Sequence, residues 1–98
     1  MSEPTPTAVT HNAQAQRFEA CVDGHLALCS YRQSGRLLEL HHTEVPAALQ
    51  GQGVAAALVQ AALAWAREQG LQVRPSCSYV AAYMRRHTET QDLLEPGR

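Results

Sequence analysis

The chain has 98 residues, 45% of them hydrophobic, and a formal net charge of −1. This length predicts one domain with a modest core, and the near-neutral charge argues against nucleic acid as the main partner. No apolar run approaches the roughly 20 residues that a membrane helix needs, so no membrane partner is expected.

The ends of the chain and its cysteines lead to further expectations. The first residues lack the basic start and apolar core of a signal peptide, which predicts a cytoplasmic protein. Three cysteines, an odd number, argue against a disulfide framework in a reducing compartment. Residues 1–14 show no apolar periodicity, so we expect a flexible N-terminal tail, then one domain over residues 15–94 and a C-terminal tail at 95–98.

The first half of the domain has the pattern of an antiparallel meander. Apolar and polar residues alternate in short runs, and the runs are separated by dipeptides that favour tight turns. Pro46 ends the last of these runs. The expected strands are residues 18–22, 25–32 and 36–45, with turns at Asp23-Gly24 and Ser34-Gly35.

The periodicity changes near Gly53. Apolar residues recur at helical spacing from Val54 to Trp65, and Gly70 is a natural C-terminal stop. A short strand is expected at Gln72–Ser76 and a final helix at residues 79–87. The predicted fold class is therefore α/β, in the order βββαβα. An antiparallel meander is followed by a parallel β-α-β crossover and a C-terminal helix.

The turn before the long helix carries two glycines, in the sequence QGQGVA at residues 50–55. The first four N–H groups of a helix lack internal partners, and glycines let an anion approach them, so the turn can form a phosphate cradle. A plain strand-to-helix turn is the alternative. A P-loop is excluded because the chain has no Lys, and the glycine spacing does not fit a dinucleotide-binding fingerprint.

The same hexapeptide resembles a family signature. It is similar to the Q/R-x-x-G-x-G/A signature of the GNAT superfamily of N-acetyltransferases, carried here by Gln50, Gly51, Gln52, Gly53, Val54 and Ala55. The His-Thr-Glu-Val-Pro segment at His42–Pro46 and the later Cys77 make the chain similar to minimal, single-domain members of that superfamily. The resemblance covers about residues 16–94.

The resemblance implies acetyl-CoA as a cosubstrate. Backbone N–H groups of Gln52–Ala55 would hold the pyrophosphate, and the main chain of Glu44 and Val45 would pair with the pantetheine arm as an added strand would. The thioester would lie in a gap between the two parallel strands. Pro75 fits such a gap because it cannot donate a ladder hydrogen bond.

The implied function is acetyl-CoA-dependent transfer of an acetyl group to an amine-bearing acceptor, either a small molecule or a protein. Larger family members cover the acceptor site with two helices after the first strand, and the Asp23-Gly24 turn leaves no room for them. Three alternatives therefore stay open: a CoA-binding module with little catalysis, a Cys-dependent thioester hydrolase, and an interaction domain without a cofactor.

Two side chains are the leading candidates for the chemistry. Cys77 falls at a helix N-terminus, which lowers a thiol pKa, so it is a candidate nucleophile; a packed core cysteine is the alternative. His42 is a candidate base or proton relay, or else a structural histidine. Strict alternation places His42 and Glu44 on the sheet face opposite Glu39, unless a bulge intervenes.

Other groups are rivals for the same roles. Glu39 and Glu44 are alternative bases. A tyrosine hydroxyl, of Tyr79 or Tyr83, can donate a proton to the leaving thiolate. An arginine near the end of the last helix, Arg85 or Arg86, can bind the 3′-phosphate of the nucleotide. Adjacent histidines on a regular strand point to opposite faces, so no metal site is expected.

Overall fold

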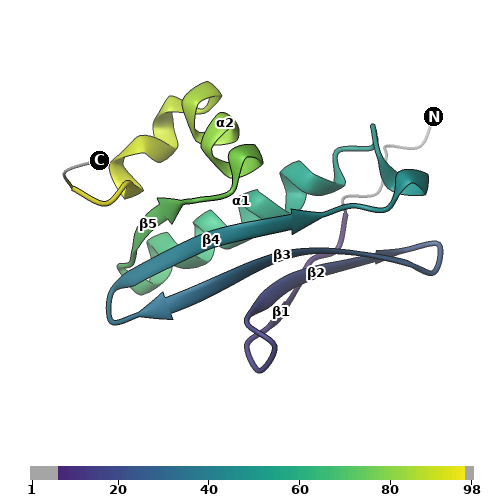
Figure 1. Ribbon diagram of the computed structural model, residues 1–98, viewed down its shortest axis with the longest axis horizontal. Helices are drawn as coiled ribbons and strands as arrows, with labels where there is room; N and C mark the ends of the chain where they lie inside the picture. Colours follow the sequence, from purple (N-terminus) through teal and green to yellow (C-terminus); the bar gives the residue numbers. More distant parts are fainter. Residues whose placement is uncertain (1–6, 97–98) are drawn as a thin grey trace.

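The computed structural model describes residues 7–96, which form a five-stranded mixed sheet with helices packed against it (Figure 1). The strands are β1 (Thr10–Asn12), β2 (Arg17–Val22), β3 (His25–Ser34), β4 (Leu37–Glu44) and β5 (Gln72–Pro75). The helices are α1 (Val54–Gln69) and α2 (Ser78–Arg86), with short 3₁₀ helices η1 (Ala47–Leu49) and η2 (Thr88–Leu93). No helix among the described residues is long and apolar enough to cross a membrane.

The sheet confirms the predicted fold class. Its strands lie in chain order, β1 to β4 are antiparallel, and β5 joins β4 in parallel after the α1 crossover. Asp23 and Gly24 form the β2–β3 turn with φ of 50° and 78°, both in the left-handed region that such a turn requires. The β3–β4 turn contains Gly35, as expected.

Part of the predicted N-terminal tail is a strand instead. Residues 1–6 lie outside the described residues, but Thr10–Asn12 forms β1 and pairs with β2. The His11 ring stacks on Phe18 with centroids 4.2 Å apart, and its Nε2 atom lies 2.7 Å from the Tyr31 hydroxyl. Three residues are too few to show a strand period, and a histidine makes the packing contact, so the apolar pattern gave no signal.

A single core lies between α1 and the sheet. Leu38 and Leu40 of β4 and Val73 of β5 have no exposed surface, and α2 packs against the same core beside α1. Gly70 ends α1 in the left-handed conformation, as its position predicts. The buried side chains of α1 lie on one face: Val54, Leu58, Val59, Ala62, Leu63 and Ala66.

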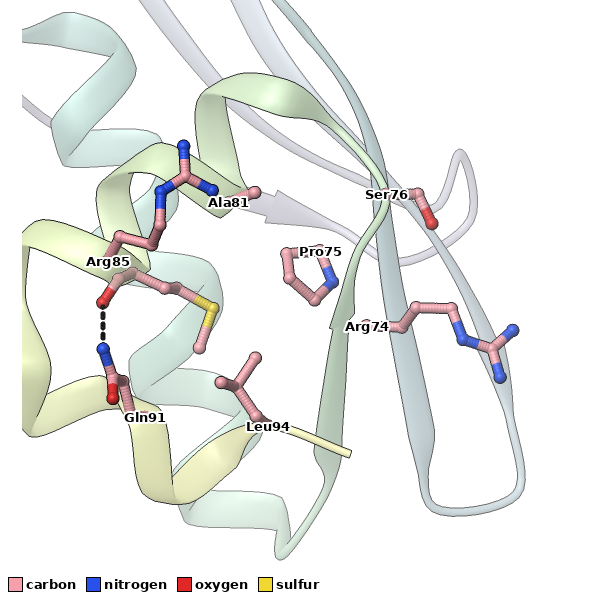
Figure 2. Close-up of a pocket in the computed structure, with 8 residues that line it drawn as sticks. Arg74, Pro75, Ser76, Ala81, Arg85, Gln91 and Leu94 are labelled. Carbon is pink, nitrogen blue, oxygen red and sulfur yellow. Dashed lines mark hydrogen bonds between the residues drawn. The ribbon is translucent and has the colours of Figure 1, made fainter. Parts of the chain in front are cut away.

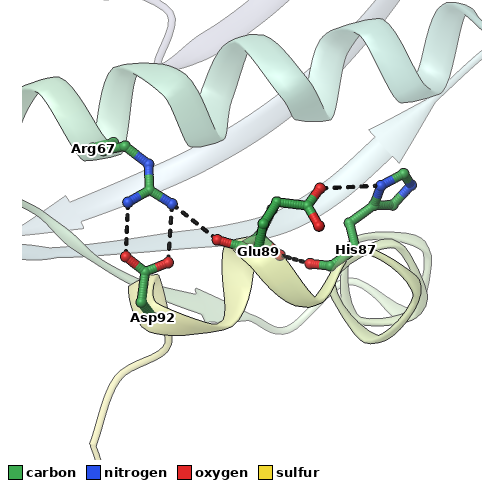
Figure 3. A network of polar contacts seen from close by, with 5 residues as sticks. Arg67, His87, Glu89 and Asp92 are labelled. Atoms are coloured by element: carbon green, nitrogen blue, oxygen red, sulfur yellow. Dashed lines mark hydrogen bonds and ion pairs between the residues drawn. The ribbon is translucent and has the colours of Figure 1, made fainter.

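The C-terminus is more structured than the sequence indicated. Helix η2 was not predicted, and it is held against α1 by Arg67, which makes two hydrogen bonds to Asp92 at 2.7 and 2.9 Å and one to the Glu89 carbonyl (Figure 3). The tail expected at 95–98 is not free at its start. The backbone N–H of Glu95 bonds to the Val73 carbonyl at 3.0 Å. Residues 97–98 lie outside the described residues.

Candidate functional site

The glycine turn forms the N-terminus of α1. Gly51 and Gly53 both have positive φ, 82° and 77°, and Gly53 is the N-cap residue. Only glycine adopts this conformation without strain, so both glycines are explained by the backbone itself. The first turn of α1 contains no acidic side chain that would compete with an anion for the helix N–H groups.

A cavity of about 340 Å³ opens at this turn. Its wall contains Gly51 and Gly53, and a Cβ atom added at either glycine would meet no protein atom within 4 Å. Val45 and, from α2, Tyr79 also line the cavity. The predicted cofactor loop therefore borders open space that α1, α2 and the end of β4 enclose together.

Two side chains of the loop form hydrogen bonds with nearby backbone carbonyl groups. The amide of Gln50 donates to the Val45 carbonyl at 3.2 Å, and the amide of Gln52 donates to the Ala48 carbonyl at 3.1 Å. The two glutamines thus hold the loop shape through their side chains. The N–H groups at the start of α1 remain the groups that an anion would meet.

β4 and β5 separate after four residue pairs. The last pair is Leu40 with Pro75, and the Leu40 carbonyl then accepts a hydrogen bond from the Cys77 backbone N–H at 3.0 Å. Alternate residues of β5 direct their N–H groups to β4 from Gln72 onward, so the missing N–H of Pro75 lies on the other side and is not the cause of the separation. The Ser76 N–H, next in that series, bonds to the Arg74 carbonyl at 3.1 Å instead. The predicted gap between the parallel strands therefore begins at Leu40, and Cys77 lies at its edge.

A bulge in β4 lies at the same point. Ser30 of β3 pairs with His42, and the next β3 residue, Tyr31, pairs with Leu40, so His41 is the extra residue. The bulge changes which side chains face the core. Thr43, rather than His42, turns toward the helix face and contacts Cys77, whereas the His42 side chain is exposed.

Cys77 is the N-cap residue of α2 and is partly exposed. Its sulfur makes no capping hydrogen bond of ordinary geometry, but it lies 3.5 Å from the Thr43 hydroxyl oxygen. Burial is the largest single influence and acts to raise the pKa of Cys77. The Thr43 hydroxyl and the backbone N–H groups of Val80, Tyr79 and Thr43 together outweigh burial, so the pKa of this thiol is lowered.

Comparisons with known proteins agree with this geometry. The sequence profile of the GCN5-related N-acetyl-transferase family matches residues 17–93. The chain belongs to this family. A similar relative is Protein NATD1 of Mus musculus, 34% identical over 96 residues that cover 93% of this chain and 87% of that protein. Protein NATD1 of Homo sapiens is 32% identical over 101 residues, covering 98% and 89%.

A solved structure is similar across nearly the whole fold. The solution NMR structure of a GCN5-like protein from Staphylococcus aureus superposes with a TM-score of 0.72 at 27% sequence identity. The match covers 97% of each chain. The small size of this GCN5-related domain is therefore shared with a solved structure.

The candidate bases Glu39 and His42 of this GCN5-related chain differ in their hydrogen-bond partners. Glu39 accepts a hydrogen bond from the Ser76 hydroxyl, which is the main reason that the pKa of this carboxyl is lowered. A carboxylate with a lowered pKa is a weaker base, so Glu39 becomes a poorer candidate. Among the described residues, no hydrogen bond or ion pair joins His42 to Cys77. The structure therefore does not assemble a Cys–His pair.

The two candidate tyrosines have separate environments. Tyr83 is buried and stacks on His87 with ring centroids 4.0 Å apart, away from the glycine turn. Tyr79 lines the turn cavity. Burial raises the pKa of Tyr79, against the opposing charge of Arg86. Tyr79 therefore keeps its proton at neutral pH and remains a candidate proton donor, with Arg86 on the same side of α2.

A second cavity, of about 430 Å³, lies between β5, α2 and η2 (Figure 2). Arg85 lies at this cavity and not at the glycine turn, so it is poorly placed to meet a nucleotide phosphate there. Arg74 borders the cavity but directs its guanidinium outward to Glu95, at 2.7 and 2.9 Å. The remaining lining residues are Pro75, Ser76, Ala81, Met84, Gln91 and Leu94.

Sequence reasoning missed Thr43 as a site residue. It lies inside the quoted His-Thr-Glu-Val-Pro segment, but the prediction chose His42 because histidine is the residue type that titrates near neutral pH. The signal that would have found it is the bulge, and a bulge depends on the register with β3, which no local pattern in β4 encodes.

Proposed function

We propose that the protein is an acetyl-CoA-dependent N-acetyltransferase that transfers an acetyl group to an amine of a small molecule or a protein. The observation that carries this proposal is the position of Cys77, a partly exposed residue whose sulfur lies beside hydrogen-bond donors where β4 and β5 separate. Membership of the GCN5-related family supports the reaction class. The cytoplasmic location is part of the same proposal, because Cys77 must stay reduced.

The glycine turn fits the pyrophosphate of acetyl-CoA. Two glycines with positive φ leave open space beside the N–H groups that run from Gln52 to Ala55. The main chain of Glu44 and Val45 would pair with the pantetheine arm. In that pairing the Val45 carbonyl would lose its present hydrogen bond from the Gln50 side-chain amide and accept one from the ligand instead.

In the proposed reaction, the Cys77 thiolate attacks the thioester carbonyl carbon, so that a bond to Cys77 forms and the bond to the CoA sulfur breaks. Tyr79 then supplies a proton to the departing CoA thiolate. When the amine takes the acetyl group, the Cys77 thiolate is regenerated. The proton that the amine loses returns to Tyr79, and the cycle balances.

The experiment is incubation with acetyl-CoA in the absence of any amine, followed by mass spectrometry of the intact protein and its peptides. We expect one added acetyl group, located on Cys77, and none in Cys77→Ser. The matched control is Cys21→Ser, because Cys21 is an exposed thiol on β2 that should not affect the adduct.

The other outcomes identify the alternatives. Absence of calorimetric binding of acetyl-CoA would refute the whole proposal. Binding without an adduct, and without amine acetylation, would make the protein a CoA-binding module. An adduct that decays equally fast with and without amines would make it a thioester hydrolase. Full amine acetylation by Cys77→Ser would remove the cysteine from the mechanism.

A further inference from the structure

Two sulfur atoms share one hydroxyl group at the point where β4 and β5 separate. The Oγ1 atom of Thr43 lies 3.5 Å from the Sγ atom of Cys77 and donates a hydrogen bond to the Sγ atom of Cys29 at 3.8 Å. Cys29 is directly opposite Thr43 on β3 and has no exposed surface. The hydroxyl therefore connects a buried thiol of the core to the partly exposed thiol at the start of α2.

The β4 bulge creates this connection. Without the extra residue His41, the alternation of the strand would continue from Leu40 and turn His42 toward the helices and Thr43 away from them. With the bulge, Thr43 occupies the inward position opposite Cys29. The local backbone change is therefore what places a hydroxyl, and not an imidazole, beside Cys77.

The hydroxyl has one proton to donate, and two sulfur atoms compete for it. While Cys77 is a neutral thiol, its S–H group can donate to Thr43, and Thr43 donates to Cys29. Once Cys77 has lost its proton, it can only accept. Hydrogen bonds to charged acceptors are roughly twice as strong as neutral ones, so the charged sulfur wins the competition.

We infer that Thr43 is a positioning residue whose hydroxyl proton turns from the Cys29 sulfur to the Cys77 sulfur and stabilises the Cys77 thiolate. The backbone N–H of Thr43 also favours this thiolate, so one residue supplies two donors. The exchange is inexpensive because Cys29 stays a neutral thiol, and a thiol sulfur is a weak acceptor. Burial, the main cause, raises the pKa of Cys29 to about 11.

The contribution of Thr43 to acetyl transfer rests on the proposed function, but its effect on Cys77 can be measured without acetyl-CoA. The experiment follows alkylation of the Cys77 peptide by iodoacetamide as a function of pH, by mass spectrometry, in the folded protein. The variants are Thr43→Val, which keeps the shape and the backbone N–H, and Thr43→Ser, which keeps the hydroxyl. Thr90→Val is the matched control, because Thr90 is a buried threonine whose hydroxyl bonds to the His87 carbonyl at 2.6 Å, in η2.

We expect Thr43→Val to move the alkylation profile of Cys77 to higher pH and to slow the reaction at neutral pH by about tenfold to a hundredfold. Thr43→Ser should retain most of the wild-type rate, and Thr90→Val should leave the profile unchanged. Cys29→Ala removes the competing acceptor and should move the profile slightly to lower pH, which tests the inference even if Thr43→Val does not fold.

An unchanged profile in folded Thr43→Val, or a shift to higher pH in Cys29→Ala, would overturn the inference. The two proposals fail separately. A shifted Thr43→Val profile, together with no acetyl adduct in the wild-type protein, would leave the role of Thr43 standing and refute the acetyltransferase mechanism. An acetyl adduct in the wild-type protein, together with an unshifted alkylation profile in Thr43→Val, would support the acetyltransferase mechanism and refute the role of Thr43.

Discussion

Replacing Gly53 with alanine separates the two reasons why a glycine can stand at the start of α1. Gly53 has a φ of 77°, and an alanine forced into the left-handed region costs about 1–2 kcal/mol. No steric penalty adds to this cost, since an added Cβ meets no protein atom within 4 Å. For a domain of this size, each kcal/mol lowers the melting temperature by roughly 4–8 °C.

Gly35 provides a matched control. It has a φ of 57°, an added Cβ there also meets nothing within 4 Å, and it lies in the β3–β4 turn at the opposite end of β4 from the cofactor loop (Figure 1). Gly35→Ala should therefore lose a similar amount of stability through the same backbone strain.

The two variants should differ in acetyl-CoA binding, measured by isothermal titration calorimetry. Gly53 lines the loop cavity, so its new Cβ would project into the space where the phosphates are expected, and affinity should fall by at least about tenfold, or roughly 1.4 kcal/mol. Gly35→Ala should bind as the wild type does. Equal affinities for the two folded variants would refute the assignment of the pyrophosphate to this loop.

Three further predictions concern the packing of β1 and the reactivity of the cysteines. Deleting residues 1–12 should lower the free energy of unfolding by about 1–3 kcal/mol in thermal or urea melts, because the stacking and hydrogen bond of His11 are lost; an unchanged midpoint would contradict the packing of β1. Burial lowers the pKa of His11, so the unfolded chain binds more protons and stability should fall as pH drops below the unfolded value of 6.5, a dependence that His11→Phe should weaken. Iodoacetamide should modify Cys77 before Cys29 in the folded protein, and acetyl-CoA should protect Cys77; faster loss of the Cys29 thiol would contradict the burial that raises its pKa to about 11.

Local signals predicted the parts of the fold that depend on a few neighbouring residues. The Asp23-Gly24 turn, the stop at Gly70 and the glycine turn before α1 all require positive φ, and the sequence supplies glycine at each. The parallel placement of β5 followed from the length of the crossover helix. These features could be read from sequence because backbone geometry selects the residue type directly.

The features that sequence reasoning missed depend on contacts between distant segments. β1 is held by His11 against Phe18 and Tyr31, and the orientation of Thr43 depends on how β4 aligns with Ser30 and its neighbour on β3. A histidine or threonine has no intrinsic preference for these positions. Their roles come from the register and packing that the rest of the chain imposes.

Two irregularities of the sheet act at one position and together account for the site. Leu40 is the last residue of β4 that pairs with β5, and the extra residue of the bulge follows it immediately. The ladder stops because the next N–H group of β5 in the series that faces β4, that of Ser76, bonds to the Arg74 carbonyl. The register shifts because β4 gains one residue against β3. The first irregularity opens the gap in which a thioester would lie. The second turns the hydroxyl of Thr43 toward the sulfur of Cys77 at the edge of that gap. In this domain, which has no helices between β2 and β3, the two irregularities thus place a partly exposed cysteine and a hydroxyl group together where β4 and β5 separate.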